Sequence, residues 1–546
     1  MTAELFKQLQ GQLGRDCKAF LPELILCGAI VLMLLLRLFK LFDKRHLGWV
    51  ALALTVYALG VSCCQWLGMG SVDPRFLPDG TMNIFSGLLV YDNFTIFLRL
   101  FLFSFTALII LLALLTGLPD KEDSADFFCL LLGAVVGMSV MASANHLLMI
   151  LLGIEMASLP SYAMAGFLKG RRQSSEAALK YVVYGSGAAG VMLYGMSLLA
   201  GRYGTAYLPD LLRFMNDGAL EPVVLMGSLF LLIGIAFKLA AFPFHFWCPD
   251  VFEGAAAEVA GFLSVASKGA ALALLARLVL GMGGLGPMDP VPAIWPRSIG
   301  IIVPAIAFLA ALTVTFGNFA AYSQTNLKRL LAYSTIAHAG FMMMGLTTCT
   351  REGAGAVLFY LIAYLLMNLG AFAVVAFLRN ATGSEDLADF RGLVHRNPLL
   401  VVTLGFFLLS LMGLPPLIGF QAKFQIFSVL FEGAKEFERI GQPGLSNTLY
   451  ALLVIGGLNT VVSLFYYVKV LKVMVLENPI EVVENKPVVP LPTPFLANVY
   501  LSVLAVAILV VGVFWNPLDQ AKKQAVIGFA EPAVPSAVQS TAQGGP

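Results

Sequence analysis

The stretch that decides the fold is Asp92–Gly117, which reads DNFTIFLRLFLFSFTALIILLALLTG. Beyond Asp92 at its start, its only charged residue is Arg99. A helix that crosses a bilayer needs about 20 mostly apolar residues. This run therefore predicts a transmembrane helix. It is long and does not alternate between polar and apolar residues, so it does not fit a strand of a membrane β-barrel.

Apolar runs of this kind recur along the whole chain. We count roughly fourteen, at 21–41, 47–69, 92–117, 126–143, 145–168, 176–201, 222–243, 256–281, 298–318, 327–347, 353–378, 399–431, 447–475 and 495–514. The chain is 59% hydrophobic and only 12% charged, with a mean hydropathy of +0.85. A soluble protein carries about 25% charged residues. The sequence therefore predicts an all-α integral membrane protein with about 14 transmembrane helices.

The polar residues exclude several other classes of protein. A net charge of +2 does not suggest nucleic acid as a partner. The seven cysteines lack the spacing of a metal site or a disulfide framework. The polar segment 1–18 has no signal-peptide cleavage site. The polar stretches 381–398 and 432–447 are large enough only for loops or short amphipathic helices along the surface.

Basic residues in three short loops predict the orientation in the membrane. They are Arg37, Lys40, Lys44 and Arg45 after the first run, Lys169, Arg171 and Arg172 after the fifth, and Lys328 and Arg329 after the ninth. If every run crosses once, these loops share one side, which we expect to be cytoplasmic. Both termini then lie on the outer, periplasmic side of a bacterial plasma membrane.

Pairs of ionisable residues hint at an internal repeat. Glu155 and His338 are 183 residues apart, and Lys238 and Lys423 are 185 apart. Five predicted helices separate the two copies, and an odd number makes the second copy cross the membrane in the opposite sense, as in transporters with inverted repeats. The expected units are helices 1–3 (1–120), a first repeat (121–290), an inverted second repeat (291–476) and a C-terminal part with the last helix (477–546).

Seven ionisable residues lie well inside apolar segments. They are Glu155, Lys180, Lys238, His245, Lys268, His338 and Lys423. A single lysine of this kind can reach back to the membrane surface, but seven across six helices favour a function, since each buried charge is costly. Arg99, Arg277, Lys469 and Lys472 lie nearer helix ends, where reaching to the surface is the better interpretation.

Two helices are expected to break beside a lysine. Pro243 has no N–H, which frees the Leu239 carbonyl next to Lys238, and Pro415–Pro416 frees the carbonyls of Leu411 and Met412 before Lys423. Unwound backbone at membrane depth is tolerated only where protein buries it or where it lines a wet cavity. The alternative is an ordinary proline kink. In the seventh helix, Lys238 and His245 are seven residues apart, which predicts one shared helix face.

The chemistry that this set of residues favours is proton movement. A lysine in a low-dielectric environment gives up its proton more readily, and a nearby carboxylate stabilises the protonated form. Glu155 is the only acid that the sequence places deep in a span. We see no glycine fingerprint, ligand cluster or nucleophile–base motif that would indicate another reaction. No cofactor is therefore expected in this chain.

Four segments carry a resemblance to a known family. They are Leu152–Tyr162, Phe237–Asp250 with Glu253 and Gly254, Leu327–His338, and Gly413–Phe424. With them the chain resembles the antiporter-like membrane subunits of respiratory complex I, over nearly its whole length. The resemblance implies an input pair of Glu155 and Lys238, a central Lys268 and an exit group at Lys423. It adds Lys180, His245 and His338 as accessory members of the proton path.

The resemblance also implies the partners. FMN and iron–sulfur clusters would reside in other subunits of an NADH-linked translocase, and this subunit would carry no redox centre. Its expected partners are the other membrane subunits, including sister antiporter-like subunits, together with lipid and protons. Lys423, with only two apolar runs after it, sets the chain apart from two of its sister subunits. Ala255–Glu258 departs from the family's usual Ala-Pro-Thr-Pro, and Glu258 is expected to add a carboxylate near Lys268.

Two other functions remain open at this stage. A subunit of a multisubunit cation/proton antiporter shares these motifs, and a membrane scaffold that conducts nothing is also conceivable. Co-purification with flavin and iron–sulfur subunits distinguishes a complex I subunit from an antiporter subunit. Loss of pumping without loss of assembly on changing Lys238 excludes the second.

Overall fold

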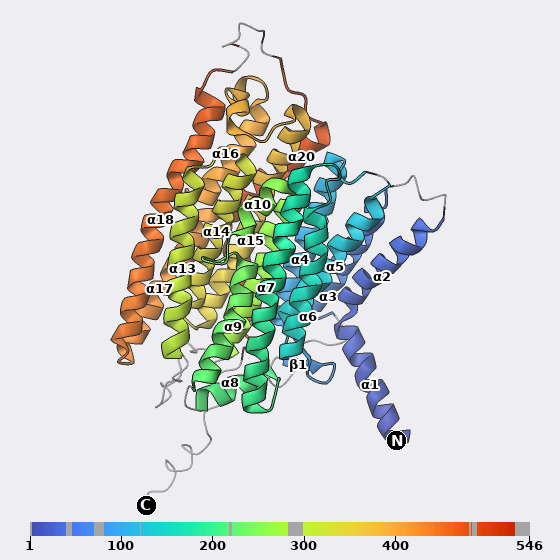
Figure 1. Cartoon of the computed structure of the whole chain (residues 1–546), viewed down its shortest axis with the longest axis vertical. Helices are drawn as coiled ribbons and strands as arrows, with labels where there is room; N and C mark the ends of the chain where they lie inside the picture. Colours follow the sequence, from blue (N-terminus) through green and yellow to red (C-terminus); the bar gives the residue numbers. More distant parts are fainter. Residues whose placement is uncertain are drawn as a thin grey trace, which may run out of the picture.

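The chain is a bundle of helices that run mostly along one axis (Figure 1). The computed structural model describes residues 3–39, 46–69, 81–120, 122–217, 221–281, 299–479, 482, 487 and 489–529. The α-helices are α1 (Ala3–Ala19), α2 (Leu21–Arg37), α3 (Gly48–Trp66), α4 (Asn93–Thr116), α5 (Ser124–Ser143), α6 (Leu147–Ala165), α7 (Arg172–Tyr203), α8 (Leu208–Asp217), α9 (Pro222–Leu239), α10 (Trp247–Gly254), α11 (Ala257–Phe262), α12 (Lys268–Gly281), α13 (Ile299–Tyr322), α14 (Leu327–Leu346), α15 (Arg351–Thr382), α16 (Pro398–Met412), α17 (Ile418–Arg439), α18 (Pro443–Leu476), α20 (Phe495–Val513) and α21 (Asn516–Val526). A π-helix (Leu263–Ser267) links α11 to α12, two 3₁₀ turns (Leu387–Phe390 and Leu393–His395) precede α16, and strands β1 (Thr81–Ile84) and β2 (Leu89–Asp92) form an antiparallel hairpin.

Eleven helices in the described part of the chain are long and apolar enough to cross a membrane, or twelve if the bent pair α1 and α2 counts as one span. The sequence predicted about fourteen. Three predicted spans are not among the eleven, and each has a physical reason. Helix α2 alone has only 17 residues, α14 begins with two cations and is rich in small and polar residues, and the twelfth span is divided into α16 and α17.

Capping explains where the long helices begin and end. The Asp92 side chain accepts a hydrogen bond from the Thr95 N–H at 2.7 Å and starts α4, and Gly117 ends it in the left-handed conformation. Helices α7 and α15 have 32 residues each and outrun the apolar segments from which they were predicted. The stretch 432–447 was expected to form loops or separate surface helices. This is wrong, since most of it continues α17 and begins α18.

Both predicted breaks are present. Helix α9 ends at Leu239, where Ala240 has a φ of 55°, and α16 ends at Met412, where Gly413 has a φ of 92°. Residues 240–246 are not helical, because Pro243 cannot continue the hydrogen-bond ladder. Lys238 and His245 therefore do not share one helix face, and that prediction is wrong.

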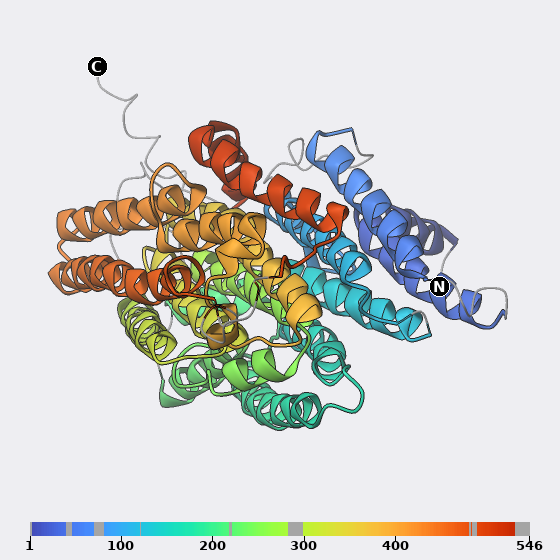
Figure 2. The ribbon, with the colours of Figure 1, turned by 90° about the horizontal axis from the view of Figure 1, so that it is seen from above.

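One end of the bundle carries the hairpin of β1 and β2, and we call it the hairpin end. At the hairpin end, an Asp16 oxygen accepts from the Phe85 N–H at 2.9 Å, and the Phe529 ring lies 5.0 Å from the Phe94 ring. Both ends of the described chain are thus at the hairpin end. Figure 2 shows α1, α2 and α3 at one edge of the bundle and α17 and α18 at the opposite edge.

The opposite end, which we call the basic end, gathers cations of the predicted loops. Arg37 pairs with Asp126, and Lys169 lies 2.8 Å from Asp123, whose hydrogen bond raises the pKa of this lysine. Arg329 of α14 lies at this end as well, paired with Asp250. Lys40, Lys44 and Arg45 lie outside the described residues.

Contacts between neighbouring helices recur about 180 residues apart. A Cβ on Gly137 would lie 2.5 Å from the Ala157 nitrogen, and one on Gly317 would lie 2.7 Å from the Ala337 nitrogen. These glycines let α5 approach α6, and α13 approach α14, to backbone contact. The predicted pairing of Glu155 with His338 uses an interval of 183, so the two residues differ by about one helical turn from equivalence.

Two isolated β-bridges follow the same interval. His146 pairs with Tyr207, and Asn326 pairs with Asp386. The first bridge lies at the hairpin end, where the Tyr207 hydroxyl donates to the Ser86 carbonyl, and the second lies at the basic end. The helix breaks are spaced differently. Lys238 precedes its break, whereas Lys423 follows its own. The interval of 185 suggested that the two lysines are equivalent, but their positions relative to the breaks show that they are not.

Candidate functional site

Lys238 is a buried cation at the break that ends α9. It occupies the last turn of α9 and is 2% exposed, and its Nζ makes no hydrogen bond to any described residue. The rings of Tyr162 and Tyr181 lie 5.9 and 6.0 Å from Nζ. Glu155 of α6, half-buried, interacts electrostatically with Lys238 but does not form a direct ion pair with it. The sequence-predicted pair thus comes together as a loose one.

Lys268 occupies a second site of the same kind. It is the first residue of α12, directly after the π-helix, a rare element often found at functional sites. The side chain is fully buried and, among the described residues, Nζ has no hydrogen-bond partner. The rings of Trp247 and Phe252 each lie 5.5 Å from Nζ. The charges of Lys238 and Lys268 act on each other, so these sites are neighbours.

Glu258 does not supply Lys268 with a carboxylate, contrary to expectation. Its two oxygens lie 3.2 and 3.3 Å from the guanidinium of Arg379 on α15. Ten residues of helix separate Glu258 from Lys268, a rise of about 15 Å. In the segment Ala255–Glu258, which departs from the family's usual sequence, Glu258 therefore forms an ion pair with a neighbouring helix.

Trp247 lies between the two lysine sites. Its indole N–H donates to the Phe237 carbonyl, next to Lys238, at 3.0 Å. Its ring stacks on Tyr181, with centroids 4.3 Å apart and planes 7° apart. One residue therefore contacts the surroundings of both Lys238 and Lys268.

Two accessory residues lie elsewhere. His245 is 2% exposed and lies among aromatic rings, with centroids 5.4 Å from Phe242 and 4.4 Å from Phe316. Lys180 is at the basic end, where its Nζ lies 2.7 Å from Asp250 and 2.9 Å from Glu176. These carboxylates, with Arg329, line a cleft of about 190 Å³. The structure thus joins Lys180 to a surface ion-pair network.

Lys423 differs from the first two lysines because it has a partner. It lies on α17, is 3% exposed, and its Nζ donates to the Met412 carbonyl at 2.8 Å. This carbonyl is one of the two that the proline pair was expected to free. The Phe341 ring lies 4.9 Å from Nζ. The broken helix therefore supplies the ligand that holds this ammonium.

His338 lies next to Lys423 and uses both ring nitrogens. Nδ1 lies 2.7 Å from the Tyr360 hydroxyl, and Nε2 lies 3.1 Å from the Tyr467 hydroxyl, which in turn lies 2.5 Å from Ser334. The charge of Lys423 acts on His338. A histidine between two hydroxyls can accept a proton from one side and donate to the other.

A chain of polar side chains that the sequence analysis missed runs between the two halves. The Asn368 side-chain amide on α15 donates a hydrogen bond to the Ser264 hydroxyl of the π-helix, and Tyr364 lies one helical turn before Asn368. The Tyr364 hydroxyl donates to Thr335 at 3.0 Å, and its ring lies 5.1 Å from that of His338. Tyr360, Tyr364 and Asn368 repeat every four residues on α15. This stripe on an otherwise apolar helix was the sequence signal.

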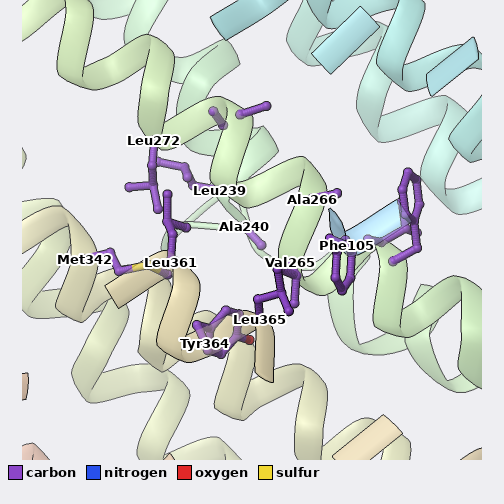
Figure 3. Close-up of a cluster of buried hydrophobic side chains, with 14 of the residues drawn as sticks. Phe105, Leu239, Ala240, Val265, Ala266, Leu272, Met342, Leu361, Tyr364 and Leu365 are labelled. Carbon is purple, nitrogen blue, oxygen red and sulfur yellow. The ribbon is translucent and has the colours of Figure 1, made fainter. Parts of the chain in front are cut away.

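An apolar layer borders this polar chain. Figure 3 shows Leu239, Leu272, Leu361 and Met342 packed together where α9, α12, α14 and α15 meet, with Tyr364 nearby. All are buried. The leucine side chains have no group that donates or accepts a proton, in contrast to the neighbouring hydroxyl and amide groups.

Two arginines were expected to reach to the membrane surface, and that interpretation is wrong. Arg99 is 1% exposed and lies 2.6 Å from Glu23, which also accepts from Ser139. Arg277 holds both oxygens of Asp92 at 2.9 Å. Their partners come from distant parts of the chain, so the spans alone did not indicate them. Within the described residues, no three His, Cys, Asp or Glu side chains are arranged to hold a metal ion.

The chain is similar to known membrane proteins over most of its length. The profile of the family described as "NADH:quinone oxidoreductase/Mrp antiporter, TM" matches residues 144–437. NADH-quinone oxidoreductase subunit N of Anaeromyxobacter sp. is 41% identical over 94% of this chain and 97% of its own length. A chain of respiratory complex I from Thermus thermophilus with bound aureothin is 30% identical, with a TM-score of 0.70 over 91% of this chain and 98% of its own. A chain of the Mrp complex from Dietzia sp. shares the fold at 16% identity, with a TM-score of 0.77 over 94% of this chain and 97% of its own.

Proposed function

The chain belongs to the NADH:quinone oxidoreductase/Mrp antiporter family of membrane subunits, and we propose that it is the proton-translocating subunit N of an NADH-quinone oxidoreductase. Electrons pass from NADH to quinone in other subunits, which hold the FMN and iron–sulfur clusters. This subunit has no redox centre and turns the energy of that reaction into proton movement. The observation that carries the proposal is the pair of buried lysines, Lys238 and Lys268, which have no hydrogen-bond partner among the described residues and lie beside helix irregularities.

The geometry supports loading of a proton at the first pair. A buried ammonium without a hydrogen bond is costly, so the neutral lysine is readily reached. Glu155 interacts with Lys238 at a distance and favours its charged form. A shift of α6 toward or away from α9 changes this interaction. Glu155 and Lys238 therefore act as the input pair, and Lys268 receives the proton next.

The second half supports onward transfer. From Lys268 the route follows Ser264, Asn368 and Tyr364 to His338, and ends at Lys423. Proton transfer needs donors and acceptors within hydrogen-bond reach or joined by water. The polar chain supplies the Ser264–Asn368 and Tyr364–Thr335 hydrogen bonds, and water joins the remaining groups. The freed Met412 carbonyl holds the terminal ammonium. His245 and Lys180 are accessory groups at the margins of this route.

Two inverted repeats form the architecture that we propose, at about 121–290 and 291–476, although their boundary near residue 290 lies outside the described residues. Matching contacts recur about 180 residues apart, and the matching β-bridges lie at opposite ends of the bundle, which supports inversion. Both ends of the described chain lie at the hairpin end, which requires an even number of crossings. Counting α2, α14 and the broken α16–α17 as spans gives fourteen.

The orientation follows from the charges. The basic end faces the cytoplasm and the hairpin end, with both termini, faces the periplasm of a bacterial plasma membrane. The other membrane subunits of the complex, including sister antiporter-like subunits, flank this chain within the bilayer.

Purification through a tag on this chain tests the assignment. We expect NADH-oxidising activity, flavin and iron–sulfur clusters to co-purify with it. A preparation of membrane subunits alone, with cation/proton exchange activity and no flavin, would instead assign the chain to a multisubunit antiporter.

A further inference from the structure

Helix α10 has two faces with different surroundings. Its inner face carries Trp247 and Phe252, whose rings lie 5.5 Å from the Lys268 ammonium. Its outer face carries Asp250 and Glu253, which lie at the basic end. A helix of eight residues is not stable on its own. Its position therefore depends on the side chains that hold it.

Lys180 of α7 contacts Asp250 on the outer face, and the other contacts come from two consecutive cations in the first turn of α14. Arg329 Nη1 lies 2.8 Å from Asp250 and 2.6 Å from Glu253. Lys328 is 2% exposed, and its Nζ donates to the carbonyl of Ala255, the C-cap of α10, at 2.7 Å. The two cations together hold both carboxylates and the C-terminal end of α10.

This arrangement favours α10 at the expense of α14. Cations in the first turn of a helix oppose its dipole, and the first turn of α14 has no acidic residue to offset them. The C-terminal end of α10, by contrast, carries partial negative charge, which Lys328 neutralises. Lys328 also lies 2.8 Å from Glu385, so this cation joins α10 to the segment after α15. Within the described residues, Arg329 forms ion pairs only with the two carboxylates of α10, so its placement is explained by what it does for that helix.

We propose that Lys328 and Arg329 clamp α10 and thereby position Trp247 as the aromatic barrier between Lys238 and Lys268. Trp247 touches the backbone beside the first lysine and faces the second. With α10 clamped, the barrier separates the two sites, and release of α10 lets a proton pass.

The clamp also connects the two halves of the molecule. Helix α14 carries Lys328 and Arg329 in its first turn and His338 about three turns later, next to Lys423. A displacement of α14 therefore moves the clamp and the second-half histidine together. This inference rests on the proposed function, because a barrier between the lysines matters only if protons pass between them.

The test uses the complete purified complex with Arg329→Gln. We expect amide hydrogen exchange of residues 247–255 to become about tenfold faster, because local opening of α10 becomes easier. We also expect fewer protons pumped per NADH in reconstituted vesicles. Lys469→Gln is the matched control. Lys469 lies at the same end and donates to the carbonyls of Tyr322 and Gln324, away from α10.

A second variant removes the carboxylates instead. Asp250→Asn combined with Glu253→Gln should reproduce both effects, and it carries the test if Arg329→Gln does not assemble. Because Asp250→Asn also removes the Lys180–Asp250 pair, Lys180→Gln, which leaves both Arg329 pairs in place, is its control. Arg329→Lys should restore most of the protection. Unchanged exchange in both variants would overturn the clamp, and faster exchange with unchanged proton stoichiometry would overturn the barrier.

Lys238→Met separates this inference from the function on which it rests. If that variant pumps normally, the proposed function fails. If it does not pump while the clamp variants behave like the parent, only the clamp fails.

Discussion

Arg99 and Lys238 are equally buried cations with opposite surroundings. Arg99 lies 2.6 Å from Glu23 and donates to the Ala19 carbonyl, whereas Lys238 has no hydrogen bond to any described residue. A charge with a fixed partner can remain charged permanently. A charge without one is stable only if it can lose its proton or meet a partner transiently. The comparison assigns Arg99 to the stability of the fold and Lys238 to its function.

The largest effect is expected from breaking the fixed pair. Arg99→Met leaves the Glu23 carboxylate buried without its cation, which should cost about 3–5 kcal/mol of stability. The thermal midpoint and the yield of assembled complex measure this loss. Glu23→Gln together with Arg99→Met should recover much of it. An Arg99→Met complex that is as stable as the parent would remove the basis of the comparison.

Lys268→Met should lower proton pumping rather than stability. Methionine fills the aromatic cage of Trp247 and Phe252 but carries no proton, so the complex should assemble while proton pumping falls about tenfold or more. Pumping is followed by a pH-sensitive dye in vesicles that oxidise NADH. Lys469→Met is the control for loss of a lysine. A properly assembled Lys268→Met complex with normal pumping would show that an unpartnered buried lysine is not by itself functional.

Lys423→Met sharpens the comparison, because this lysine has a backbone partner. We expect a fall of about threefold to tenfold in pumping, since the terminal group is lost while the Met412 carbonyl can still bind water. Lys423→Arg keeps the donor and should pump better than Lys423→Met. Intact pumping in Lys423→Met would argue decisively against a single path that ends there.

Tyr364→Phe should have the smallest effect. It removes one hydroxyl from the polar chain and keeps the ring in the apolar layer of Figure 3. Loss of one neutral hydrogen bond costs about 0.5 kcal/mol at the lower end, or about twofold in rate. Tyr194→Phe on the exposed face of α7 is the control. Equal pumping rates for both variants would exclude Tyr364 from the path.

Much of the fold could be predicted from the sequence, because a membrane span is decided by local composition. The run 92–117 corresponds to α4 at Asn93–Thr116, and the prolines of the seventh and twelfth spans placed both breaks. The family motifs led to the lysines of the site. The length of an apolar run and the position of a proline are local properties, so both can be determined from a single sequence.

What the sequence did not indicate depends on contacts between distant segments. Glu23, the partner of Arg99, is 76 residues away, and Asp92 is 185 residues from Arg277. No feature of the neighbouring sequence predicted the π-helix before Lys268. The repeat was aligned on rare ionisable residues, whereas the backbone contacts that define its register involve glycine and alanine.

The central claim is that Glu155 and Lys238 load protons for translocation. The most direct measurement is the number of protons pumped per NADH oxidised by the reconstituted complex carrying Lys238→Met, with Lys469→Met beside it. The account predicts an assembled complex whose proton stoichiometry falls clearly below that of the control. A stoichiometry equal to that of the control, in a complex of normal composition, would contradict it.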